Sequence, residues 1–144
     1  MEALGESAVL ATPVQVLLAY SAVAMRGDVF RLHWPSDPAH SSPLLRRVKL
    51  RSRTVDLLTA GFEECVQVGT CHAAGVPGVR VAGKTGTAGD EGAGGQTHAW
   101  FVGYAPVDHP EIALVIFLER GTGAHDAAPL AGEILRHYFA SGKQ

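Results

Sequence analysis

The stretch Ile112-Ala-Leu-Val-Ile-Phe-Leu118 is an unbroken apolar run with no polar alternation. Such a run predicts a strand that is covered on both faces of a sheet. Residues 79–87 and 97–105 also have strand character, and a turn at 108–110 separates the second of these from the apolar run. The sequence therefore predicts a three-strand antiparallel meander, with strands at about 79–87, 97–105 and 111–119.

Helical patterns flank this sheet on both sides. Thr12-Pro13-Val14-Gln15 combines a capping threonine, a first-turn proline and a capping-box glutamine, and predicts a helix over about 12–26. Apolar residues spaced by three and four predict a second helix over about 53–68, and a third is expected over about 126–140. Residues 28–51 contain several prolines and serines and are interpreted as a long loop. The order of elements indicates a single α+β domain over 1–144.

The apolar strand lacks one neighbour. Chain order supplies the strand at 97–105 for one of its edges, and no other stretch of the sequence offers a strand for the second edge. Because an interior strand needs hydrogen-bonding partners on both sides, this edge is expected to lack its natural partner.

Composition narrows the function classes. A net charge of −2 over 144 residues gives no reason to expect nucleic acid as a partner. One basic run exists, and without interleaved aromatic residues it is expected to be a solvated loop leading into a helix: Arg46, Arg47, Lys49, Arg51 and Arg53. No apolar run approaches membrane-spanning length, and no leader pattern follows Met1. The histidines lack zinc-site spacing, so neither a metal nor a cofactor is expected.

Two cysteines stand six positions apart near the end of the second predicted helix. Cys65 and Cys71 could close a small loop as a disulfide, and a pair of free thiols is an equal alternative. Neither state establishes the cellular compartment.

The segment Gly83-Lys84-Thr85-Gly86-Thr87 carries the clearest chemistry in the chain. It places one cation, two hydroxyl groups and bare peptide N–H groups on a short extended segment, which suits a substrate that carries a carboxylate. Strand alternation sends Lys84 and Thr85 to opposite faces, so both can serve one site only where the strand is twisted or lies at a sheet edge.

A nucleotide site is the alternative interpretation of Lys84. Residues 78–85 match the phosphate-loop pattern G-x-x-x-x-G-K-[ST]. A phosphate loop must open a helix whose first amides face the phosphates, whereas the residues after Thr85 are glycine-rich and unsuited to a helical first turn. The context therefore favours the strand.

Four stretches together resemble the transpeptidase domain of penicillin-binding proteins. They are Gly-Lys-Thr-Gly-Thr-Ala at 83–88, His-Ala-Trp-Phe-Val-Gly-Tyr-Ala-Pro at 98–106, Ala-Thr-Pro-Val-Gln at 11–15 and Ala-Ala-Pro at 127–129. Their order and spacing also agree, and the His-Ala-Trp-Phe form is similar to the monofunctional, elongation-type group. The resemblance implies a serine β-lactamase/transpeptidase-like fold, peptidoglycan cross-linking and a location on the extracytoplasmic face of the bacterial membrane.

The resemblance also implies roles for single residues. Lys84 would hold positive charge near the nucleophile and the substrate carboxylate. The hydroxyl groups of Thr85 and Thr87 would bind the carboxylate of a D-Ala-D-Ala stem peptide or a β-lactam. The Thr87 backbone N–H would be one oxyanion donor, and Gly86 would leave room for the acyl group.

The catalytic half of the family's site is missing from this sequence. None of the seven serines has a lysine three positions later, and the chain contains no asparagine, so both the Ser-x-x-Lys and the Ser-x-Asn elements are absent. The family keeps these elements, and the first strands of its sheet, in the earlier part of the domain. The chain thus resembles only the C-terminal portion, without a nucleophile, and is expected to be inactive alone. A truncated gene product, an N-terminal transpeptidase half on another chain, and a non-catalytic interaction remnant remain as alternatives.

Overall fold

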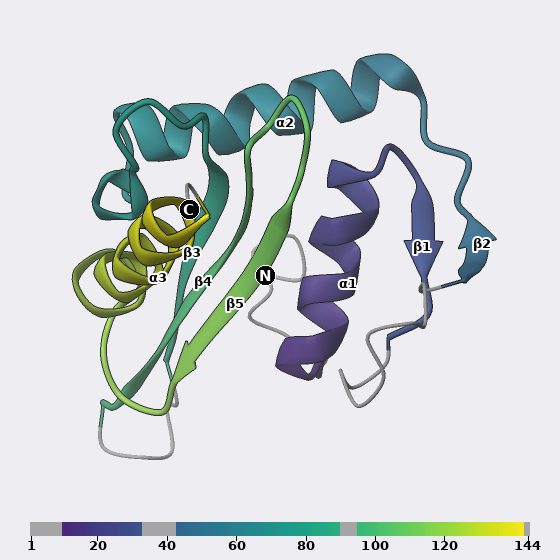
Figure 1. Cartoon of the computed structure of the whole chain (residues 1–144). Helices are drawn as coiled ribbons and strands as arrows, with labels where there is room; N and C mark the ends of the chain where they lie inside the picture. Colours follow the sequence, from purple (N-terminus) through teal and green to yellow (C-terminus); the bar gives the residue numbers. More distant parts are fainter. Residues whose placement is uncertain (1–9, 33–42, 90–94, 143–144) are drawn as a thin grey trace.

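The computed structural model describes residues 10–32, 43–89 and 95–142 (Figure 1). An antiparallel sheet lies between helices, with a small hairpin beside the first helix. The elements in chain order are α1 (Pro13–Ala24), β1 (Asp28–Phe30), β2 (Leu44–Arg47), α2 (Ser52–Gln67), the 3₁₀ turn η2 (His72–Ala74), β3 (Ala82–Gly89), β4 (Thr97–Ala105), β5 (Ile112–Leu118), the π-helical turn η3 (Gly123–Ala127) and α3 (Ala128–Ser141).

The main sheet has the order β3-β4-β5, with both neighbouring pairs antiparallel. The predicted α+β fold with a three-strand meander is confirmed. Phe101 at the centre of β4 pairs with Thr85 on β3 and with Ile116 on β5, so the middle strand links the two edge strands. Within the described residues, β5 pairs with β4 alone, and its other edge has no strand beside it.

The apolar core lies between one face of the sheet and α3. Phe101, Leu135 and Ala131 are fully buried there, together with residues of η2 and of the end of α2. Small residues let α3 approach the η2 turn closely, since a Cβ at Gly132 would lie only 2.2 Å from the carbonyl oxygen of Ala73 in that turn. Helix α1 lies on the other side of the sheet and contacts β4 and β5, while α2 crosses the end of the sheet (Figure 1).

Helix α1 begins as the sequence predicts. The Thr12 hydroxyl accepts a hydrogen bond from the Gln15 amide at 3.3 Å, and the Gln15 side chain accepts one from the Thr12 amide at 2.8 Å. This reciprocal capping box satisfies two N–H groups that the helix itself leaves unpaired. A groove of about 530 Å³ separates α1 from the β1–β2 hairpin and is lined mainly by aliphatic side chains.

The interpretation of residues 28–51 as a continuous loop is wrong. Asp28–Phe30 and Leu44–Arg47 pair as antiparallel strands, and an Asp28–Arg47 ion pair joins them. Gly27 makes the entry into β1 possible, because its φ is +108° and a Cβ there would lie 2.3 Å from the Val48 carbonyl oxygen. Part of the basic run therefore lies on β2. Strands of this length carry too few residues to show an alternating pattern, so pairing decides them.

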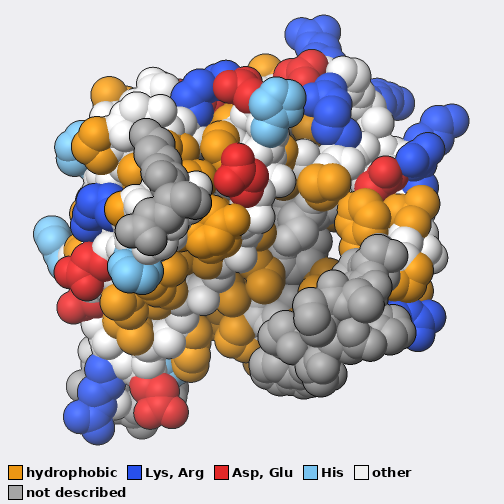
Figure 2. All heavy atoms as spheres, viewed as in Figure 1, with side chains coloured by type: hydrophobic (Ala, Val, Ile, Leu, Met, Phe, Trp, Pro, Cys, Tyr) orange, Lys and Arg blue, Asp and Glu red, His pale blue; other side chains and the backbone are white. Residues whose placement is uncertain are grey.

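The space-filling view shows how apolar residues reach the surface (Figure 2). Hydrophobic side chains run down the middle of this view, along β5, where Phe117 is 38% exposed. A second group lies over α1 and the hairpin, inside an outer rim of Lys and Arg side chains. No helix in the described ranges has the length and hydropathy to cross a membrane.

Candidate functional site

The segment that carries Lys84 is part of β3, an edge strand of the sheet. It runs extended from Ala82 to Gly89, in continuous register with β4. No helix opens at Lys84, so its amides do not converge on a point as a phosphate loop requires. The nucleotide-binding interpretation of residues 78–85 is therefore wrong. A sheet edge is one of the two arrangements, the other being a twisted strand, in which Lys84 and the threonines can serve a common site.

Lys84 is exposed on one face of this edge. Its ammonium nitrogen donates a hydrogen bond to the carbonyl oxygen of Thr85 at 2.7 Å, which keeps the charge close to the strand. Gly83 beside it is needed for packing, because a Cβ there would lie 2.5 Å from the Phe101 ring. On the same face as Lys84, a Cβ at Gly86 would lie 3.3 Å from the Cβ of Trp100, so a larger residue would have to displace its neighbour.

Thr85 points to the opposite face and is only 8% exposed. Its hydroxyl oxygen lies 2.6 Å from the hydroxyl oxygen of Thr70, in a hydrogen bond that joins β3 to the turn after α2. That turn is closed by a disulfide between Cys65 and Cys71, so the structure has the disulfide rather than two free thiols. The substrate-binding role predicted for the Thr85 hydroxyl stays a prediction, and in this structure the group binds within the protein.

Thr87 lies further along the same face as Thr85, at an exposed position. Its hydroxyl oxygen accepts a hydrogen bond at 3.0 Å from the backbone amide of Gly123, which belongs to the connection between β5 and α3. Thr70 and Gly123 are the two neighbours of this segment that the sequence did not reveal. The only sequence feature near the second is the pair of glycines at 121 and 123, which precede the predicted third helix.

Two other features are structural. His98 contacts the Glu119 carbonyl oxygen through Nδ1 at 2.9 Å, and its ring lies 5.5 Å from that of Phe117, so it ties β4 to the end of β5. The ring of Phe117 in turn packs on Trp100. Across the described ranges, no cluster of His, Cys, Asp or Glu could hold a metal ion.

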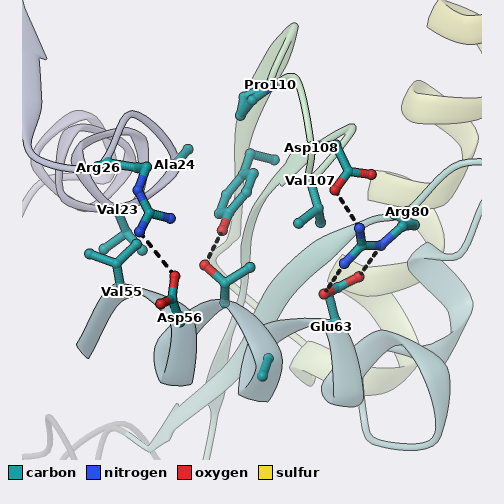
Figure 3. A pocket seen from close by; sticks show the side chains of 13 residues that line it. Val23, Ala24, Arg26, Val55, Asp56, Glu63, Arg80, Val107, Asp108 and Pro110 are labelled. Carbon is teal, nitrogen blue, oxygen red and sulfur yellow. Dashed lines mark hydrogen bonds and ion pairs between the residues drawn. The ribbon is translucent and has the colours of Figure 1, made fainter. Parts of the chain in front are cut away.

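A separate groove of about 350 Å³ lies between α1, α2 and the β4–β5 turn (Figure 3). Arg80 donates two hydrogen bonds to Glu63 and one to Asp108. Hydrogen bonding to Glu63 is the largest cause, and hydrogen bonding to Asp108 the next, of a pKa of Arg80 that lies above its ordinary value. Arg26 and Asp56 pair on the opposite wall. Each of these charged side chains is paired with one of opposite charge. The ion pairs therefore link the elements around the groove and leave no unpaired charge among them for a ligand.

The floor of this groove holds a buried tyrosine. The Tyr104 hydroxyl lies 3.1 Å from that of Thr59 on α2. Burial raises the pKa of Tyr104, and the hydrogen bond to Thr59 offsets part of that effect. The phenol therefore stays neutral and acts as a polar link between α2 and β4.

The geometry as a whole suits recognition of a carboxylate. One edge strand presents an exposed ammonium group from Lys84 on one face and an exposed hydroxyl group from Thr87 on the other, with Gly86 between them in the chain. A hydroxyl and an ammonium both donate to carboxylate oxygens, and charge-assisted hydrogen bonds of this kind are the strong ones. The described residues place no serine–lysine pair beside this edge, so the strand can bind and polarise but has no attacking group.

Comparison with known proteins finds one family. The model described as "Penicillin binding protein transpeptidase domain" matches residues 1–136. Among curated relatives, the peptidoglycan D,D-transpeptidase MrdA of Acinetobacter baumannii is 28% identical over 98% of this chain and 24% of its own length. Stage V sporulation protein D of Bacillus subtilis is 30% identical over 87% of this chain and 22% of its own. The chain thus spans about a quarter of the length of these relatives.

Solved structures agree with the sequence matches. Penicillin-binding protein PBP2 of Helicobacter pylori superposes with a TM-score of 0.81 at 26% identity, covering 99% of this chain and 27% of that one. The transpeptidase domain of Burkholderia pseudomallei penicillin-binding protein 3 gives a TM-score of 0.72 at 26% identity, covering 92% of this chain and 43% of that one. The similarity therefore extends over nearly all of the present fold.

Proposed function

This chain belongs to the penicillin-binding protein transpeptidase family, and from that premise we propose that it forms the carboxylate-binding part of a peptidoglycan D,D-transpeptidase site. The resemblance to the elongation-type group is confirmed by relatives such as MrdA. The observation that carries the proposal is the position of Lys84 and Thr87 on the exposed edge of β3.

Each residue of this edge has a task in that reaction. The Lys84 ammonium attracts the terminal carboxylate of a D-Ala-D-Ala stem peptide or a β-lactam, and the Thr87 hydroxyl donates a hydrogen bond to it. The Thr87 amide is one of the two oxyanion donors, and Gly86 leaves the acyl group free to lie along the strand. Donors fixed before the reaction stabilise the negative oxygen of a tetrahedral intermediate because they need no reorganisation. Thr85 contributes through its hydrogen bond to Thr70, which fixes β3 to the turn after α2.

Binding is the direct test. In NMR titrations, the chain is expected to bind N-acetyl-D-Ala-D-Ala, and Lys84→Ala is expected to weaken this binding about tenfold, as for loss of a hydrogen bond between charged groups. Lys49→Ala is the matched control, since Lys49 is an exposed lysine outside the main sheet. Equal affinities of the Lys84 and Lys49 variants would contradict the assignment.

The attacking serine has to come from elsewhere. We propose an N-terminal transpeptidase half, carrying Ser-x-x-Lys, as the partner that completes the site. The edge of β5 supports this, because that apolar strand has a neighbour on one side only among the described residues. The disulfide supports assembly on the extracytoplasmic side, where thiols are oxidised.

Labelling with a fluorescent penicillin separates binding from catalysis. The chain alone is expected to show no covalent label after denaturing electrophoresis, because an acyl-enzyme requires a nucleophile. A full-length transpeptidase from the same family, treated in parallel, shows that the reagent is active. A labelled band at the mass of this chain would refute the proposed division of the site.

A further inference from the structure

The connection between β5 and α3 folds back onto the Lys84–Thr87 edge. Gly123, which is buried, lies so close to β3 that a Cβ on it would be 2.6 Å from the Gly86 carbonyl oxygen and 2.8 Å from the Thr85 Cβ. From this position its amide donates the 3.0 Å hydrogen bond to the Thr87 hydroxyl oxygen. The contact joins residues 36 positions apart in the sequence.

This hydrogen bond determines what the Thr87 hydroxyl can do. A hydroxyl group has one hydrogen to donate and two lone pairs to accept with. The Gly123 amide occupies a lone pair and fixes the side-chain rotamer, so the hydroxyl hydrogen is directed away from Gly123 and is available as a donor. A carboxylate oxygen accepts this hydrogen in a charge-assisted bond, whereas the carbonyl oxygen of a terminal amide accepts it in a weaker, neutral one.

Asp126 in turn holds the connection in place. Its Oδ2 accepts a hydrogen bond from the Thr122 amide at 2.7 Å and one from the Thr122 hydroxyl at 3.2 Å. The preceding Gly121 has a φ of +126°, and a Cβ there would lie 2.7 Å from the same carboxylate oxygen. On the other side, Thr97 of β4 exchanges two hydrogen bonds with Gly121, at 2.9 and 2.8 Å.

We propose that Asp126, through Thr122 and Gly123, is a positioning residue that orients the Thr87 hydroxyl to donate, and so selects ligands that end in a free carboxylate. Asp126 itself does not contact the ligand. The inference rests on the proposed function in one respect, namely that Thr87 binds the carboxylate. It adds a specificity element from a part of the chain that lies after the sheet.

The test compares two substitutions of Asp126. Asp126→Asn removes the charge but keeps an acceptor oxygen for both Thr122 donors, whereas Asp126→Leu removes the acceptor in a similar volume. Glu133→Leu, at an exposed position of α3, controls for loss of an acidic group and gain of an apolar one. For each protein, NMR three-bond couplings give the Thr87 χ1 populations, and titrations give the Kd for N-acetyl-D-Ala-D-Ala and for its C-terminal amide.

One pattern of results supports the proposal. The wild type, Asp126→Asn and Glu133→Leu are expected to hold Thr87 in one rotamer and to prefer the acid over the amide. Asp126→Leu is expected to average Thr87 over the staggered rotamers. With the competent rotamer reduced to about a third, the Kd for the acid rises about threefold, and that for the amide, which accepts a weaker bond, rises less.

The two proposals fail in different ways. A single Thr87 rotamer and unchanged acid preference in Asp126→Leu would overturn the positioning role, and so would an Asp126→Asn variant that behaves like Asp126→Leu. A wild-type chain that binds neither peptide would overturn the proposed function. In that case the Thr87 couplings still decide whether Asp126 orients the hydroxyl, because they need no ligand.

Discussion

Phe101→Ala is expected to lower the free energy of unfolding by about 3–5 kcal/mol, as for other buried aromatic residues replaced by alanine. Phe101 is fully buried on the central strand of the sheet, and its ring fills the space left open by two glycines. A Cβ at Gly83 would lie 2.5 Å from the ring, and one at Gly103 would lie 3.0 Å from it. Because glycine cannot move into the vacated volume, the cavity is expected to persist.

Urea unfolding followed by circular dichroism measures this effect. Phe117→Ala is the matched control, since Phe117 is on the adjacent strand but is 38% exposed. Its loss should cost less, because less of its apolar surface leaves water when the chain folds. Equal losses for the two variants would mean that the core does not lie on the α3 side of the sheet.

Removal of the Cys65–Cys71 disulfide is the second large effect expected. Cross-linking residues six positions apart restricts the unfolded chain and contributes about 2 kcal/mol to stability. The closed turn also carries Thr70, whose hydroxyl binds Thr85 on β3. The double variant Cys65→Ser/Cys71→Ser is therefore expected to unfold at lower urea concentration and to weaken the contact between Thr70 and Thr85 on β3.

A reductant provides the internal control for this prediction. Dithiothreitol should lower the unfolding midpoint of the wild type to that of the double variant and should leave the double variant unchanged. The Thr85 and Thr70 amide resonances should shift together on reduction, since one hydrogen bond joins these residues. If dithiothreitol left the urea midpoint of the wild type unchanged, the disulfide would contribute nothing to stability.

Local patterns in the sequence were sufficient for the main elements. The capping box at Thr12 and Gln15 predicted the start of α1, and the apolar run from Ile112 to Leu118 predicted β5. Both are signals between residues close in the chain, for which backbone hydrogen bonding and side-chain burial follow a fixed period. The Lys84 segment was likewise predicted to be a strand, and its glycines already argued against a helix.

Other features depended on contacts between distant residues. The β1–β2 hairpin was missed because three- and four-residue strands have no readable period and depend on pairing with each other. The inward position of Thr85 follows from strand alternation, but its partner Thr70 is set by how the turn after α2 packs on β3.

The sequence by itself therefore determined the family, the antiparallel sheet and the strand that carries the Lys84–Thr87 segment. Only the tertiary structure decided that the Gly123 amide binds the Thr87 hydroxyl and that Asp126 holds the adjoining Thr122. A hydrogen bond between residues 36 positions apart produces no periodic pattern in the sequence. Local patterns record what each segment needs for its own backbone, whereas the orientation of one hydroxyl depends on which distant amide the folded chain brings to it.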